Sequence, residues 1–229
     1  MRRRLLAVAV ALAGVLAMAA PANAAVDQPV AVWQMDEPPG ARAMLDSSGN
    51  GIDGIVGTGV GVRGGSYNFP FVRPNQPPAN PERLVQVAHD DRLNPGTGDF
   101  AVELRMRTTR NFGNVVQKGQ AGARGGYFKF QQPNGKISCL FRGSAGSSTA
   151  SSGAVRVNDG QWHTVRCERT ASGVVMTVDG AVTGRNRNPT GTIANTRPLT
   201  IAGKLNCDQV EITCDYFAGD LDYLKIETS

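Results

Sequence analysis

Apolar and polar residues alternate along much of this chain. In the segment 100–107, Val102, Leu104 and Met106 fall at every second position, and charged residues stand between them. Side chains two residues apart lie on the same side of a β-strand. The pattern therefore predicts a strand with one buried and one solvated face, as in an antiparallel sheet. No segment after residue 24 repeats apolar residues at helical spacing over three turns.

Short alternating segments recur, separated by glycine, proline and asparagine. The predicted strand pairs and the final strands are 126–130 with 135–141, 162–169 with 174–178, 199–202 and 216–226. Pro133-Asn134-Gly135 is a predicted turn within the first pair, and Asp179-Gly180 offers the positive φ of a type I′ turn. About 12 to 14 such segments predict an all-β fold, a two-sheet antiparallel sandwich in one domain.

Two segments interrupt the pattern. The segment 73–83 carries four prolines and is predicted to be an ordered surface excursion. The segment 144–153 is rich in serine and glycine, so it is predicted to be a mobile loop tip.

The first 24 residues have the layout of a secretory signal peptide. Arg2-Arg3-Arg4 precede an apolar run over 5–20, and Ala22-Asn23-Ala24 is a small-x-small cleavage site. The run is shorter than the roughly 20 residues that span a bilayer, which makes a retained signal anchor the less favoured alternative. We therefore expect a signal peptide at 1–24, a mature domain at 25–229, and a secreted, extracellular protein.

Charge gives no support for a nucleic-acid partner. The formal net charge of the 229-residue chain is +5, from 24 basic and 19 acidic residues. Three of the basic residues belong to the predicted leader, and removing them leaves a balance of +2. Such a balance does not indicate a polyanion-binding surface. No segment after the leader is apolar enough to cross a membrane, so no membrane association is expected once the leader is cleaved.

Export makes the cysteines informative. There are four, and an even number in an oxidising compartment predicts two disulfides. Three pairings are possible. We favour Cys139–Cys167, because both residues fall in predicted strands, and Cys207–Cys214, which closes a small loop. The alternative, a zinc site, lacks the C-x₂-C spacing.

An ordered set of motifs runs through the chain. The motifs are VWQMDE (32–37), LDSSGNGIDG (45–54), GDFAVE (98–103), NDGQWHTV (158–165) and FAGDLDYLKI (217–226). In this order the chain resembles the laminin-G-like branch of the concanavalin A-like lectin/glucanase superfamily, in a form common in secreted bacterial proteins. The resemblance implies a jelly-roll of two curved antiparallel sheets. It also implies a lectin-like role in binding glycans or proteins, often with a structural calcium ion.

One short segment has the spacing of a calcium loop. Oxygen-bearing side chains stand near a glycine turn, and the predicted ligands are Asp46, Ser48, Asn50 and Asp53. Gly57 occupies the position where an EF-hand needs a bidentate glutamate, so a complete EF-hand is excluded. Ligands from elsewhere must complete the shell; the candidates are Asp36, Asp220 and Asp222, and Asp222 is included in the predicted set. The alternative is an Asx turn, in which Asp46 and Asn50 bond nearby backbone N–H groups.

Aromatic residues and arginines are the candidates for ligand contact. Trp33 and Trp162 are each expected to pack in the core, and the alternative for Trp162 is an exposed ring that stacks on a sugar. The three aromatic residues of YNFPF (67–71) share one face of an extended chain, which predicts either core packing or a sugar-stacking platform. Arg105, Arg107 and Arg110 could recognise acidic glycans or cell-wall phosphates, the alternative being a solvated face.

Catalytic motifs are missing. The dense E-x-D-x-x-E strand of the glucanases in this superfamily does not occur, nor does a G-x-S-x-G elbow. No catalytic residue is therefore assigned, and Ca²⁺ is the sole cofactor expected. We expect a secreted non-catalytic module that binds an extracellular glycan or cell-wall polysaccharide. The alternatives are a protein-binding or adhesion module and a glycan-active hydrolase with an unrecognised site. The residues that bind the ligand are not identified from the sequence.

Overall fold

The computed structural model describes residues 28–72, 82–205 and 215–229. The predicted leader, most of the proline-rich segment and the pair Cys207 and Cys214 lie outside these residues. Within the described part, no helix is long and apolar enough to cross a membrane.

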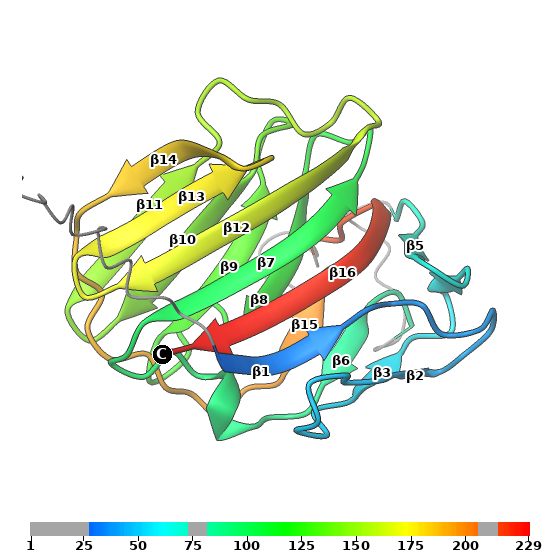
Figure 1. The fold of residues 1–229 in the computed structure, drawn as a ribbon, viewed down its shortest axis with the longest axis horizontal. Helices are drawn as coiled ribbons and strands as arrows, with labels where there is room; N and C mark the ends of the chain where they lie inside the picture. Colours follow the sequence, from blue (N-terminus) through cyan, green and yellow to red (C-terminus); the bar gives the residue numbers. More distant parts are fainter. Residues whose placement is uncertain (1–27, 73–81, 206–214) are drawn as a thin grey trace, which may run out of the picture.

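Two antiparallel sheets stack face to face (Figure 1). The front sheet has the order β14 (Ala181–Asn186), β13 (Gly173–Val178), β12 (Trp162–Thr170), β7 (Phe100–Arg107), β16 (Gly219–Thr228), β5 (Tyr67–Phe69) and β4 (Gly61–Val62), with β1 (Gln28–Trp33) also paired to β16. The back sheet has the order β11 (Gly146–Ser151), β10 (Ser138–Gly143), β9 (Tyr127–Gln132), β8 (Gly113–Lys118), β15 (Leu199–Ile201), β6 (Val85–Val87), β3 (Gly54–Val56) and β2 (Ala43–Met44). The predicted all-β sandwich is confirmed. A 3-10 helix, η1 (Asp91–Leu93), follows β6.

The core lies between the sheets and follows from the alternation in the sequence. Val102, Leu104 and Met106 of β7 are fully buried, as predicted. From the facing sheet, Phe128 and Phe141 meet Phe100, with ring centroids 5.3 and 6.3 Å away. Burial of such side chains contributes about 1.5–3 kcal/mol each, so this interior is the main source of stability.

The Cys139–Cys167 disulfide is confirmed and joins the two sheets. Cys139 lies on β10 of the back sheet and Cys167 on β12 of the front sheet, with Cα atoms 6.6 Å apart. The loop that it closes spans 28 residues. In the chain-entropy account, such a closure stabilises the folded state by roughly 3–4 kcal/mol.

The turn residues behave as expected, but one predicted loop is wrong. Asp179 and Gly180, at the β13–β14 turn, have φ values of 51° and 79°, as a type I′ turn requires. The segment 144–153, predicted to be a mobile tip, instead contains β11, which pairs with β10 over its whole length. Ser148 and Ala150 of β11 are buried while their neighbours are exposed. A strand of small residues therefore closes this edge of the sheet.

Candidate functional site

Three chain segments meet at the end of the sandwich opposite the C-terminus (Figure 1). We call residues 69–72, 107–112 and 215–220 the rim. Register brings them together, because Asp220 of β16 pairs with both Arg107 of β7 and Asn68 of β5. The turn after β7 is fixed by Thr108, whose hydroxyl donates to the carbonyl of Ala218 at 2.6 Å.

A close backbone contact completes the rim. The N–H of Asn114 donates to the carbonyl of Asp215 at 2.7 Å. Gly113 lies against Phe217, and a Cβ at Gly113 would stand 2.5 Å from the Cα of Phe217. Only glycine fits this approach, so the start of β8 holds the 215–217 segment in place.

Two phenylalanines of the rim are exposed. Phe71 is 55% exposed and Phe112 is 57% exposed, while Tyr67 and Phe69 are buried. The YNFPF segment therefore divides: the strand ends at Phe69, and Phe71 leaves the core. The guanidinium of Arg110 lies 4.3 Å from the centre of the Phe71 ring. Large apolar side chains exposed beside polar groups are typical of ligand-binding surfaces.

The two phenylalanines line one hollow. Its volume is about 360 Å³, and its other lining residues are Val72, Thr109, Arg110, Asn111, Asp215 and Tyr216. The hydroxyl of Tyr216 is buried and has no hydrogen-bond partner in the described part of the chain. Burial raises the pKa of Tyr216, so the group stays a neutral hydroxyl. An unpaired buried hydroxyl costs free energy unless a ligand or water bonds to it.

A second hollow of about 340 Å³ adjoins the first and shares Phe71, Thr109 and Arg110 with it. Arg107 and Asp220 line this part and are joined at 2.8 Å. Asn68 donates to the other oxygen of Asp220 at 2.7 Å. The combined surface offers apolar rings flanked by amide, carboxylate and guanidinium groups.

The expectation that Trp162 packs in the core is wrong. This residue is half-buried on the outer face of the front sheet, and not in the core, with Arg105 and Arg107 at 4.9 and 4.7 Å from its ring centre. Both guanidinium groups lie over the Trp162 ring. Arg105 also forms an ion pair with Asp222 at 2.5 Å. Trp33 is fully buried as expected, and its indole N–H donates to the carbonyl of Ile52 at 2.8 Å.

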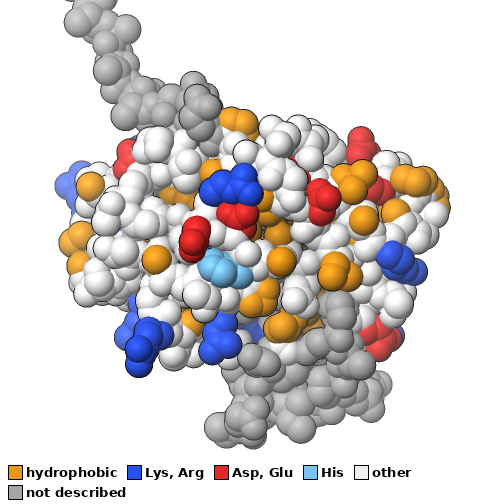
Figure 2. All heavy atoms as spheres, turned by 90° about the horizontal axis from the view of Figure 1, so that it is seen from below, with side chains coloured by type: hydrophobic (Ala, Val, Ile, Leu, Met, Phe, Trp, Pro, Cys, Tyr) orange, Lys and Arg blue, Asp and Glu red, His pale blue; other side chains and the backbone are white. Residues whose placement is uncertain are grey.

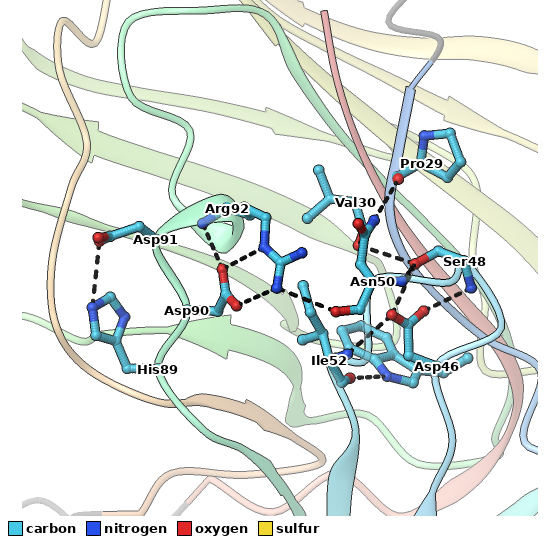
Figure 3. Close-up of polar contacts among 11 residues, drawn as sticks. Pro29, Val30, Asp46, Ser48, Asn50, Ile52, His89, Asp90, Asp91 and Arg92 are labelled. Carbon is cyan, nitrogen blue, oxygen red and sulfur yellow. Dashed lines mark hydrogen bonds and ion pairs between the residues drawn. The ribbon is translucent and has the colours of Figure 1, made fainter.

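The residues of the predicted calcium loop come together, but as an internally bonded turn (Figure 3). One carboxylate oxygen of Asp46 accepts from the backbone N–H groups of Val32 and Ser48, both at 2.9 Å. The other accepts from the Ser48 hydroxyl at 2.8 Å and from the Ile52 N–H at 3.1 Å. Burial alone would raise the pKa of Asp46, but these bonds outweigh it and lower the pKa. This is the geometry of the Asx-turn alternative.

The other predicted ligands do not complete a metal shell. The Asn50 side-chain amide donates to the Pro29 and Val30 carbonyls at 3.2 and 3.0 Å, and one oxygen of Asp53 accepts from the Asp46 N–H at 2.8 Å. Asp220 and Asp222 bond to arginines instead of joining the loop. Across 28–72, 82–205 and 215–229, no group of three His, Cys, Asp or Glu residues is placed to hold a metal. Because both Asp46 oxygens already accept hydrogen bonds from the protein, the loop as folded does not fit a cation.

The sequence did not single out Phe112 or Tyr216. A signal for Phe112 existed, since it stands between Asn111 and Gly113, two residue types that are common in turns. Tyr216 lies at the start of a predicted strand, and only the packing shows that its hydroxyl has no partner within 28–72, 82–205 and 215–229.

Stacked antiparallel sheets with exposed aromatic residues in a rim hollow are the features of a β-sandwich binding module. The chain belongs to the laminin G domain family, whose model matches residues 106–228. The resemblance found in the sequence is thereby confirmed. No curated protein matches the chain.

Solved structures share the fold. Domains LG4-5 of the mouse laminin alpha1 chain are 17% identical, with a TM-score of 0.55, over 76% of this chain and 45% of that one. The binding domain of Paraclostridial Mosquitocidal Protein 1 is 13% identical, with a TM-score of 0.60, over 89% and 48%. This chain therefore spans about half the length of these two structures.

A third structure matches over nearly its whole length. Domain 4 of AbnA, an extracellular arabinanase from Geobacillus stearothermophilus solved in complex with arabinotriose, is 14% identical, with a TM-score of 0.61. The match covers 88% of this chain and 93% of that domain. At these identities the comparisons establish the fold, and not a shared ligand.

Proposed function

We propose that this chain is a non-catalytic carbohydrate-binding module whose sugar site is the rim hollow. The observation that carries the proposal is the pair of exposed rings, Phe71 and Phe112, which line one hollow together with Arg110, Asn111 and Asp215. Sugars present apolar C–H faces and hydroxyl groups, so rings beside hydrogen-bonding side chains match them. Domain 4 of AbnA, which carries arabinotriose, supports the ligand class.

The two rings make apolar contact with the sugar, and the polar groups orient it through hydrogen bonds. The Arg110 guanidinium lies over the Phe71 ring, so its N–H groups can donate to a sugar hydroxyl or carboxylate at the edge of that ring. The side chains of Asn111 and Asp215 line the same hollow and offer hydrogen-bonding groups to sugar hydroxyls. A preformed site of this kind binds with little reorganisation of the protein.

The test uses arabinotriose and a panel of neutral and acidic oligosaccharides, with binding measured by isothermal titration calorimetry. Substituting both rings, Phe71→Ala with Phe112→Ala, is expected to weaken binding at least tenfold, about 1.4 kcal/mol. The matched control is Ile55→Ala, because Ile55 is equally apolar and 62% exposed but lies on β3, away from the rim. Equal affinity in the double variant and the wild type would refute the rim as the sugar site.

The same panel separates the other functions. Capture of an extracellular protein that free sugar does not compete would indicate the protein-binding alternative. Release of shorter oligosaccharides on prolonged incubation would indicate a hydrolase. The non-catalytic proposal expects neither.

We also propose that the mature domain acts outside the cell. The leader pattern of residues 1–24 and the Cys139–Cys167 disulfide support an oxidising, extracellular location. Amino-terminal sequencing of the protein recovered from culture medium should begin at Ala25. Recovery of the full-length chain from the membrane fraction would indicate a signal anchor instead.

A further inference from the structure

A lysine is buried where β8 ends. Lys118 is the last residue of β8, it is 0% exposed, and its register partners Phe128 and Leu199 are core residues. Its amine donates to the backbone carbonyls of Asn195 and Arg197 at 2.9 and 2.8 Å. The amine therefore stands against the segment that leads into β15, in an interior where a charge is costly.

The side-chain amide of Asn195 lies beside this amine. Asn195 is 6% exposed, and its Oδ1 is 3.5 Å from Nζ of Lys118. The same Oδ1 accepts from the backbone N–H of Arg197 at 2.9 Å, which polarises the carbonyl. The amide nitrogen donates to the carbonyl of Gly126 at 2.9 Å and so is held away from the amine.

A proton acceptor completes the arrangement. Nδ1 of His89 is 3.2 Å from Nζ of Lys118, and its Nε2 is 3.4 Å from Asp91 of η1. The His89–Asp91 pair is drawn in Figure 3. On the face shown in Figure 2, acidic and basic side chains lie close together. The His89 side chain is 28% exposed. His89 can therefore take a proton from the buried amine and pass it to solvent.

Burial makes the Lys118 amine easier to deprotonate. Burial lowers the pKa of Lys118 to about 8, although nearby Asp91 and Asp90 oppose the shift. Desolvation of this kind is how proteins make a lysine nucleophilic. Three parts of a reactive site are thus present together: the Lys118 amine as nucleophile, His89 as base, and the backbone N–H of Arg197 as donor to Oδ1 of Asn195.

We propose that Lys118 and Asn195 are joined by an intramolecular isopeptide bond. His89 removes a proton from the Lys118 ammonium, and the free electron pair of Nζ attacks Cγ of Asn195. The negative charge that develops on Oδ1 is held by the N–H of Arg197. His89 passes its proton to solvent, a second proton moves from the newly bonded Nζ to the amide nitrogen, the Cγ–Nδ2 bond breaks, and ammonia leaves. One N–C bond forms, one breaks, and no oxidant or further reactant is needed.

The bond would tie β8 to the segment before β15 within the back sheet, whereas the disulfide joins the two sheets. The alternative is a buried ammonium that bonds only to its oxygen and nitrogen acceptors. Mass distinguishes the two, because only the isopeptide has lost ammonia.

The experiment is intact-mass spectrometry of the purified, reduced wild-type protein, followed by peptide mapping. We expect the chain to be lighter than its sequence by one ammonia and to yield one branched peptide joining Lys118 to Asn195. A full sequence mass would overturn the proposal. A lighter chain without the branched peptide would also overturn it, since a succinimide at Asn195 loses ammonia too.

Two variants serve as controls. Lys118→Arg keeps a cation in the same place but removes the nucleophile, so it should show the full sequence mass. His89→Gln removes the base, so the lighter form should accumulate more slowly than in the wild type. A branched peptide that forms at the wild-type rate in His89→Gln would remove His89 from the mechanism. If Lys118→Arg does not fold, the wild-type peptide map alone still decides whether the bond exists.

Discussion

The 46–53 loop and the rim are both polar surface regions, but their groups are used differently. In the loop, Asp46 accepts four hydrogen bonds, and Asn50 and Asp53 bond to neighbouring backbone. In the rim, two phenylalanines are exposed, and the Tyr216 hydroxyl is buried with no hydrogen-bond partner among the described residues. A cluster whose hydrogen bonds are all internal stabilises the fold, whereas exposed rings flanked by polar side chains are available to a ligand.

The largest expected effect tests the structural side of this comparison. Asp46→Ala leaves three backbone N–H groups and one hydroxyl without their acceptor, so it should lower the free energy of unfolding by about 2–3 kcal/mol. Urea denaturation measures this change. The matched control is Asp36→Ala, an exposed carboxylate, expected to change stability by less than about 0.5 kcal/mol. Loss of sugar binding in a folded Asp46→Ala protein would show that the two regions are not separate.

The next effect tests the binding side. Arg110 forms no ion pair among the described residues and lies over Phe71, whereas Arg105 pairs with Asp222. Arg110→Gln is expected to weaken sugar binding about fivefold, close to 1 kcal/mol, with stability unchanged. Arg105→Gln should leave the affinity unchanged. Calorimetric titration of both variants checks the difference, and equal losses would assign the effect to general surface charge.

A third polar cluster should behave like the loop and not like the rim. Nδ1 of His163 is 2.7 Å from Asp179, and its Nε2 is 3.0 Å from Asp159. Burial alone would lower the pKa of His163, but the two carboxylates outweigh it and raise the pKa. Both nitrogens donate only when the ring is protonated.

The sign of the pH effect follows. A histidine whose pKa is raised on folding stabilises fully below its unfolded pKa of about 6.5, and this stabilisation disappears as pH rises through the folded value. As pH rises from about 6.5 through the folded pKa of His163, the melting temperature of the wild type should therefore fall relative to that of His163→Gln. Sugar affinity should not follow the same curve. The prediction would be contradicted if the difference in melting temperature between the wild type and His163→Gln were the same at every pH.

The smallest expected effect concerns metal. Calcium binding by the 46–53 loop stays a prediction from the sequence, but each Asp46 oxygen already faces two donors. EDTA should therefore leave the melting temperature of the mature domain unchanged, and calorimetry with Ca²⁺ should show no heat. A drop in melting temperature that added Ca²⁺ restores would show that the loop rearranges to bind the ion.

The sequence by itself determined the layers of the fold. Alternation over 100–107 matched β7 at both ends, and Asp179-Gly180 formed the expected turn. Cys139 and Cys167 paired as favoured. These features are local: a period of two, a residue that tolerates positive φ, and cysteines in strands are all readable within a few positions.

Only the tertiary structure decided which surfaces are free. Trp162 and Trp33 occupy similar alternating segments, yet one meets two arginines on the outer face and the other fills the core. The strand β11 has little apolar signal and exists because β10 pairs with it. Arg107 and Asp220 are 113 positions apart, and their bond depends on the register between β7 and β16. Local periodicity shows which side of a strand is apolar, but partners brought together from distant positions decide which polar and aromatic groups are left for a ligand.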